Sequence, residues 1–380
     1  MIYLDNSATT KPDPSVVQSF LQVTEKFFGN PSSIHELGAE VEKLQTRARE
    51  QAANLLQVKP QEIIFTSGGT EGNNLAIKGI ALKYMNRGKH IITTEIEHPS
   101  VYETCKSLQK FGFRITFLPV NERGINDVQQ LEKAITDDTI LVSVMHVNNE
   151  IGSIQPIAEV GQILKKYPKI FFHVDAVQAL GKVPIELQNN GIDLCTFSGH
   201  KIHGLKGTGI LFMKEGTSLY PLFHGGNQEF GIRSGTENVA GNVSIVRALR
   251  LILERQQNEI DRLKRLREKL FRTLSSMEYV YMNSPEDGAP HILNVSVPGL
   301  KPEVVIHALY EKSATISTQS ACSSKQQDES RILLACGYTK DRTTSGLRIS
   351  LSYHNTEEDI DEFIDIFEQT IRELKEILER

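Results

Sequence analysis

Short apolar runs alternate with amphipathic stretches through the middle of the chain. The apolar runs predict strands at 62–66, 90–94, 114–118, 140–145, 170–174, 193–197 and 209–213. Between them, apolar residues recur every three or four positions and predict helices, notably at 71–85, 100–111, 127–135 and 157–166. This alternation is typical of a mainly parallel sheet with helices on both faces. Ligand sites in such sheets lie at the carboxyl ends of the strands.

Further helical patterns flank this region. Helices are expected at 16–28 and 36–58 before it and at 239–275 after it, and strands at 292–297 and 347–351 surround a helix at 302–311. Thr356 caps a final helix. A chain of 380 residues exceeds the usual size of one hydrophobic core. We therefore predict an α/β fold with a large domain (16–258), a smaller α/β C-terminal domain (259–380) and an N-terminal segment (1–15) that packs with the small domain.

The composition describes a mildly acidic protein, with 39% hydrophobic residues, 23% charged residues and a formal net charge of -5. This charge does not favour direct nucleic-acid binding. No apolar run approaches the roughly 20 residues that span a bilayer, and the chain does not open on a basic segment followed by an apolar one. A cytoplasmic protein is expected. The 4 cysteines lack paired metal-ligand spacing, so we expect reduced thiols and no resident metal.

One stretch, 196–204, places Lys201 directly after a predicted buried strand. Burial lowers the pKa of a lysine ammonium and leaves an amine that can form a Schiff base with an aldehyde. Ser198 and His200 offer polar groups for an anionic handle. A pyridoxal phosphate (PLP) site requires these features. The alternative, an ordinary surface lysine in a polar loop, is favoured if this stretch is considered by itself.

The loop 66–71 joins a strand to a helix, and its glycines allow backbone amides to approach an anion closely. The loop is therefore a candidate phosphate cradle. The loop lacks the lysine of a P-loop and the three-glycine spacing of a dinucleotide fingerprint, so a nucleotide site is the weaker interpretation. A tight strand-to-helix turn without a ligand explains this loop about equally well.

Three more polar residues follow predicted strands. His98 offers a flat ring and a proton-transfer nitrogen, although a histidine before a proline is more often structural. Asp175 ends a strand, where its carboxylate can pair with a protonated pyridine nitrogen or cap a helix. Asn149 is open to a similarly plain structural explanation.

The cysteines differ in their surroundings. Cys105 lies on the apolar face of a helical pattern, Cys195 lies within a strand and Cys336 lies at a helix end, so all three are expected to be core residues. Cys322 is surrounded by small or polar side chains, which predicts an exposed loop. An exposed thiol can be a nucleophile.

Together, these residues resemble the PLP-dependent cysteine desulfurases of the class V, fold type I aminotransferase superfamily. The resemblance covers essentially the whole chain. The motifs that carry it are LDNSATT at 4–10, SGHK at 198–201, RSGT at 233–236 and SAC at 320–322. Their order and spacing together are more specific than any one of them. The resemblance implies a large PLP-binding domain and a small domain that carries the cysteine loop.

The resemblance also implies a role for each matching position. Lys201 would hold PLP as a Schiff base, Asp175 would pair with the pyridine nitrogen, and His98 would stack on the ring and move protons. Gln178 would bind the ring hydroxyl. The residues implied to hold the phosphate are Gly69, Thr70, Ser198 and His200, with Thr236 contributed by the second subunit of a homodimer.

The substrate contacts are likewise implied. Asn149 would contact both the cofactor and the substrate carboxylate, and Arg348 would bind that carboxylate through two parallel hydrogen bonds. A structural ion pair is the alternative for Arg348, because it lies in a strand pattern.

By the same resemblance, the chain would convert L-cysteine to L-alanine. The freed amine of Lys201 would remove the α-proton, and the Cys322 thiolate would attack the substrate sulfur and become a persulfide. The sulfur would pass to an acceptor protein, either an iron-sulfur scaffold or a tRNA-thiolating enzyme. Cys322 is also a candidate transient ligand of an iron-sulfur cluster.

Two other functions stay open. The chain could catalyse a different reaction of the superfamily, such as aminotransfer or β-elimination from another amino acid, with Cys322 as a bystander. Alternatively, it could be a non-catalytic sulfur-trafficking or scaffold protein that retains the fold.

Overall fold

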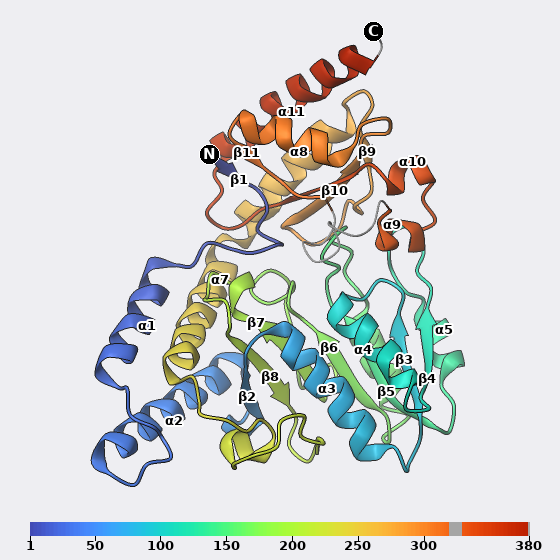
Figure 1. Ribbon diagram of the computed structural model, residues 1–380. Coiled ribbons are helices and arrows are strands. Elements are labelled where there is room, and N and C mark those ends of the chain that lie inside the picture. The colour runs from blue at the N-terminus through green and yellow to red at the C-terminus, as the bar shows by residue number, and fades with distance from the viewer. Residues whose placement is uncertain (319–328, 379–380) are drawn as a thin grey trace.

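The computed structural model describes residues 1–318 and 329–378. In these residues the strands form sheets of seven, three and two strands (Figure 1). The seven-stranded sheet has the order β2 (Ile63–Thr66), β8 (Gly209–Met213), β7 (Leu194–Ser198), β6 (Phe171–Asp175), β5 (Thr139–Met145), β3 (His90–Thr94) and β4 (Arg114–Leu118). The seven strands predicted between residues 62 and 213 all form, with ends shifted by one residue at most.

Most neighbours in this sheet are parallel, as predicted. The exception is β8, which is antiparallel to both β2 and β7. Parallel neighbours need a long crossover, usually helical, and the short connection between β7 and β8 contains only a 3-10 turn, η2 (Gly199–Lys201), in place of such a helix. The chain therefore returns antiparallel, and η2 places Lys201 just beyond the end of β7.

Helices cover both faces of the large sheet. α3 (Gly69–Tyr84) and α4 (Pro99–Gln109) pack with alternate strand residues such as Leu141 and Leu211 in one apolar cluster. α5 (Val128–Ala134), α6 (Ile157–Leu164) and part of α7 (Val239–Ser275) pack on the other face with the intervening residues, such as Val142 and Phe212. The predicted α/β class is confirmed, because the strands between these two clusters are buried on both sides.

The helix α7 connects the two larger sheets. Its first half packs against α1 (Pro14–Lys26) and α2 (Glu36–Leu56), and its second half buries Leu263, Leu266 and Leu270 in the same core as the three-stranded sheet (Figure 1). The predicted boundary at residue 258 falls inside this continuous helix. The division of the chain into two domains stays a prediction.

The three-stranded sheet lies in the C-terminal part of the chain. Its strands β12 (Gly346–Ser350), β10 (Ile292–Ser296) and β9 (Tyr281–Met282) are antiparallel, and α8 (Pro302–Glu311) and α11 (Glu357–Leu378) belong to the same part. At the other end of the chain, β1 (Ile2–Tyr3) pairs with β11 (Ala314–Thr315). The start of the chain is therefore attached to the C-terminal part, and the N-terminal segment then runs from there to the large sheet.

Two short helices, α9 (Arg331–Ala335) and α10 (Lys340–Thr343), follow α8 in the C-terminal part. α9 ends with Cys336 as its C-cap, where a helix end was expected, whereas α10 was not expected, because it is too short to show a helical period. Ile332 and Leu333 of α9 pack with Ile96 and Met145 of the large sheet's region. Figure 1 shows α9 above the ends of β3 and α4. α9 thus docks on the edge of the sheet where ligand sites are expected.

The predicted core cysteines Cys105, Cys195 and Cys336 are buried and unbridged. The fourth, Cys322, lies outside the described residues. In the described residues, no helix combines the length and the apolar character needed to cross a membrane.

Candidate active site

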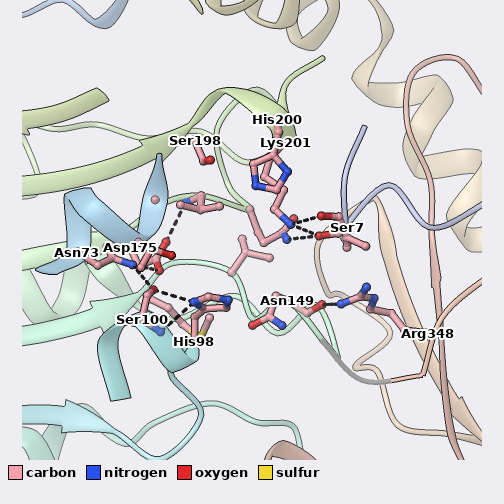
Figure 2. Close-up of a pocket in the computed structure, with 17 residues that line it drawn as sticks. Ser7, Asn73, His98, Ser100, Asn149, Asp175, Ser198, His200, Lys201 and Arg348 are labelled. Carbon is pink, nitrogen blue, oxygen red and sulfur yellow. Dashed lines mark hydrogen bonds between the residues drawn. The ribbon is translucent and has the colours of Figure 1, made fainter. Parts of the chain in front are cut away.

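A pocket lies at the carboxyl ends of β5, β6 and β7, where the large sheet meets the N-terminal segment and β12 (Figure 2). The structure brings together in its lining every predicted site residue of the described chain except Thr236. These residues are Gly69, Thr70, His98, Asn149, Asp175, Gln178, Ser198, His200, Lys201 and Arg348. They come from six separate segments of the sequence, so their convergence is a property of the fold.

Thr236 does not line this pocket. It is exposed in the loop that precedes α7. The resemblance assigns it to the site of a second subunit, and this assignment stays a prediction. Cys322, the predicted nucleophile, lies outside the described residues.

Lys201 is held from both ends. Its Nζ donates to the carbonyl oxygens of Ser7 and Ala8, the latter at 2.8 Å. Its own carbonyl oxygen accepts a hydrogen bond of 2.8 Å from Nζ of Lys182, a buried lysine whose pKa is lowered to about 8 by burial. Figure 2 shows the Lys201 side chain reaching toward Ser7 across the pocket. The lysine is therefore not a free side chain on the open surface.

The turn at the start of α3 has the features of an anion cradle. Its N-cap is Gly68, with φ of 148°, and no side chain caps the helix. Backbone amides of the first turn are therefore available to a ligand. A Cβ atom at Gly69 would lie 2.9 Å from Cγ2 of Val177, which is too close for any residue other than glycine without movement. Ser198 borders the same turn.

His200 lies beside this cradle and is neutral at pH 7. Burial, followed by the charge of Lys201, lowers its pKa to about 4. Its Nδ1 lies 3.2 Å from Oγ1 of Thr9 in the N-terminal segment. A neutral imidazole at this position can donate a hydrogen bond to an anionic group without adding charge to the pocket.

His98 and Asp175 belong to one hydrogen-bond network (Figure 2). His98 Nδ1 accepts from the backbone amide of Ser100 at 3.1 Å and lies 2.7 Å from its hydroxyl. The amide of Asn73 donates to Ser100 Oγ at 2.8 Å and to Asp175 Oδ2 at 2.7 Å. Because Nδ1 accepts, the neutral His98 ring carries its proton on Nε2. Burial and the charge of Lys201 lower the His98 pKa to about 4.

Asp175 is the last residue of β6, and its other oxygen accepts from the backbone amide of Val177 at 3.0 Å. Burial raises the pKa of its carboxyl group. A cationic partner in the pocket would favour the ionised form and offset this effect. His98 and Asp175 thus cap local turns, as the structural alternatives proposed, while both also line the pocket.

Arg348 lies in the middle of β12 and is only 1% exposed. One Nη donates to the carbonyl oxygen of Asn149 at 3.0 Å, and the other donates to Asp5 Oδ1 at 3.0 Å and to Ser317 Oγ at 2.8 Å. The structural ion pair considered for Arg348 therefore exists. Among the described residues, however, no group accepts from its buried Nε, although Arg348 lines the pocket. A buried donor of this kind is suited to an anionic ligand.

Sequence reasoning did not assign roles to several residues around the pocket. Asp5, Ser7 and Ala8 belong to the LDNSATT motif, but their contacts join segments that the sequence pattern does not connect. Asn73 and Ser100 are polar residues buried on helices α3 and α4. A polar residue among the otherwise apolar positions of the first turns of a helix that follows a strand was the signal that could have revealed them.

Comparisons with known proteins agree with this geometry. The aminotransferase class-V family model matches residues 2–363. The chain is 46% identical to a NifS/IcsS protein homolog of Lactobacillus delbrueckii, with 99% of both chains covered, and 45% identical to cysteine desulfurase IscS of Klebsiella pneumoniae, covering 99% of this chain and 94% of the relative.

Solved structures extend the comparison to the fold. A NifS-like protein superposes with a TM-score of 0.92 at 38% identity, covering 98% of this chain and 99% of that one. The structure titled SspA in complex with cysteine has a TM-score of 0.82 at 33% identity, covering 94% of this chain and 100% of that one. These matches confirm fold type I. The chain belongs to the aminotransferase class-V family and, within it, to the PLP-dependent cysteine desulfurases.

Proposed function

We propose that the chain converts L-cysteine to L-alanine and takes up the sulfur as a persulfide on Cys322, which then donates it to an acceptor protein. The observation that carries the proposal is the convergence of Lys201, the glycine cradle, Asp175, His98 and Arg348 in one pocket. Relatives named cysteine desulfurase IscS, at 42% to 45% identity over 99% of this chain, support it.

The residues present fit the family's cofactor. PLP supplies an electron sink for the charge that develops on the substrate α-carbon. Lys201 would hold its aldehyde carbon, Asp175 its ring nitrogen and Gln178 its ring hydroxyl, with His98 against the ring. The phosphate would be held by the first turn of α3 at Gly69 and Thr70, together with Ser198 and His200. Arg348 and Asn149 would hold the substrate carboxylate.

The chain's own groups then move protons and sulfur. Lys201 Nζ accepts the α-proton of L-cysteine. His98, through Nε2, helps to move protons to and from the substrate. The Cys322 thiolate attacks the substrate sulfur. A sulfur–sulfur bond forms, the bond between sulfur and the substrate β-carbon breaks, and its electron pair stays on carbon, which is protonated to give alanine. An acceptor thiol attacks the persulfide in the same way.

We further propose a cytoplasmic homodimer in which Thr236 completes the phosphate site of the other subunit. The exposure of Thr236, outside its own pocket, supports this arrangement. The acceptor is an iron-sulfur scaffold or a tRNA-thiolating enzyme. A protein acceptor is favoured over direct contact with RNA because a net charge of -5 opposes binding to phosphates. Residues 259–380 would act as the smaller domain that carries the Cys322 loop.

A single-turnover reaction tests the proposal. Purified PLP-loaded protein is mixed with L-cysteine, and alanine release and the mass of the Cys322 peptide are followed, with Lys201→Ala and Cys322→Ser alongside. Alanine and a Cys322 persulfide should rise together, and neither variant should form that persulfide. If Cys322→Ser keeps full turnover of an amino acid, a transaminase or β-lyase replaces this proposal. If the purified protein binds no PLP, the scaffold function replaces it.

A further inference from the structure

Arg331 occupies an unusual position between the C-terminal part of the chain and the pocket. It is the first residue of α9, and its neighbour Ser330 donates to a carboxylate oxygen of Glu150 at 2.7 Å. The apolar residues that follow, Ile332 and Leu333, pack with Ile96. Arg331 is therefore fixed against the turn that precedes His98.

The guanidinium of Arg331 holds this turn directly. Its two Nη atoms donate to the backbone carbonyl oxygens of Glu95 and Glu97, residues more than 230 positions earlier in the sequence. Its central carbon lies 4.1 Å from the ring centroid of Tyr102, one turn into the helix that His98 caps. Within the described residues, Arg331 forms no ion pair with a carboxylate. Its planar fork of donors is thus directed at main chain and an aromatic face.

The turn 95–97 depends on side chains for its carbonyl hydrogen bonds. Arg331 serves the carbonyls of Glu95 and Glu97, and Asn148 Nδ2 donates to the carbonyl of Ile96 at 2.9 Å. Three successive carbonyls are therefore held by tertiary contacts. Because the turn leads directly into His98, the position of the turn determines the position of the His98 backbone and therefore of its imidazole ring.

The positive charge of Arg331 also affects the protonation of His98. The charged or titratable groups that face His98 are Lys201 and His200 from the loop after β7, and Arg331 from α9; each favours the neutral imidazole. Glu97, the residue before His98, is buried, and burial raises its pKa to about 8. A cation beside a neutral ring opposes protonation of that ring.

We propose that Arg331 is a positioning residue for His98, holding the turn 95–97 so that the imidazole keeps its place and orientation in the pocket. The inference rests on the proposed role of His98 in proton transfer. Arg331 is not among the described residues that line the pocket, so it would act through His98. It also ties α9, which follows the Cys322 segment in sequence, to the same turn.

Arg342 provides a matched control. Its guanidinium donates to the carbonyl oxygen of Met282 and to Oδ1 of Asn283, and lies 4.0 Å from the ring centroid of Tyr338. These contacts resemble those of Arg331, but they do not involve the turn 95–97 that leads into His98. Arg342→Gln should therefore report the general cost of losing such an arginine.

The experiment compares Arg331→Gln, Arg331→Lys and Arg342→Gln in the full-length PLP-loaded protein. We expect kcat for L-cysteine to fall roughly tenfold to a hundredfold in Arg331→Gln, with KM little changed because Arg348 is not disturbed. Arg331→Lys keeps the charge but not the fork, so it should recover only part of kcat. Arg342→Gln should retain wild-type kcat.

Histidine nitrogen shifts supply a second readout, with His98 assigned by comparison with His98→Gln. In Arg331→Gln the pKa of His98 should rise, because a nearby cation is lost, and Nδ1 should lose its fixed acceptor role. Because lysine keeps the positive charge but not the planar fork, Arg331→Lys should restore the His98 pKa more fully than it restores the nitrogen shift of Nδ1. Unchanged His98 signals in Arg331→Gln, or a kcat equal to that of Arg342→Gln, would overturn the proposal. If the wild-type protein forms no alanine, the proposed function fails, while the His98 signals still decide the role of Arg331.

Discussion

The two sides of the pocket are built by different means. On the sheet side, Asp175 ends β6 and His98 caps α4 after the turn that follows β3. Asn73 and Ser100 join the two residues, so the order of the strands brings them together. On the opposite side, Arg348 is held by Asp5, 343 positions away in sequence. This second side depends on the N-terminal segment remaining in place. Because of this difference, we expect substitutions on the sheet side to change kcat and substitutions on the opposite side to change KM.

The largest effect is expected on the sheet side, from Asp175→Asn. The amide keeps the size of the side chain but removes the charge that would face the cofactor's ring nitrogen. We expect kcat to fall roughly 10²–10³-fold, as for the loss of other preorganised electrostatic groups, with a smaller change in KM for L-cysteine. Steady-state kinetics of alanine release measure both.

Asp193→Asn is the control for this substitution. Asp193 is a partly buried aspartate of the same sheet that accepts from the backbone amide of Phe172 at 2.9 Å, but it precedes β7 and does not line the pocket. It should cost stability and leave kcat unchanged. Equal losses of kcat in both variants would mean that Asp175 acts through the sheet and not through the site.

A second, intermediate effect is expected on the opposite side, from Asp5→Asn. Arg348 loses its ion-pair partner, and its guanidinium is no longer fixed for the substrate carboxylate. We expect KM for L-cysteine to rise about tenfold with kcat changed less. Because a buried charge is left without its partner, unfolding should also become easier by about 3 kcal/mol. Initial rates and urea unfolding provide the two measurements.

Asp13→Asn separates this effect from general loosening of the N-terminal segment. Asp13 pairs with Arg255 at 3.4 Å and caps α1, and asparagine preserves the capping oxygen. Its KM should equal that of the wild type. A rise in KM with Asp13→Asn as large as that with Asp5→Asn would show that the segment matters as a whole and that Asp5 does not orient Arg348 specifically.

The same division explains how much the sequence could predict. Strand ends, the glycine turn and His98 lie in local patterns, so the sheet side could be inferred from apolar periodicity and loop composition. Other roles depend on contacts between residues 193 to 343 positions apart, which leave no periodic signal in the sequence. These are the roles of Asp5, of the carbonyl groups of Ser7 and Ala8, and of Arg331. The antiparallel direction of β8 was missed because it follows from the lack of a crossover helix.

The smallest effect tests the sheet side through pH. Glu97 accepts from Oγ1 of Thr94 at 2.7 Å and from the backbone amide of Met145 at 2.9 Å, and burial raises its pKa to about 8 from an ordinary 4.5. Between these two values the folded protein binds more protons than the unfolded chain, so the contribution of Glu97 to stability decreases as pH rises. One proton limits this slope to about 1.4 kcal/mol per pH unit.

Glu97→Gln isolates that contribution, because the amide oxygen retains both hydrogen bonds and cannot ionise. Buried histidines such as His173, whose pKa burial lowers to about 3, destabilise the fold as pH falls, but they are common to both proteins and cancel in the difference. Urea unfolding at about pH 5, 6.5 and 8 should therefore show the variant gaining stability relative to the wild type as pH rises. Parallel curves would mean that Glu97 titrates near its ordinary value, and that the turn before His98 is hydrated instead of buried. The same result would weaken the contrast between a sealed sheet side and a side that depends on the N-terminal segment.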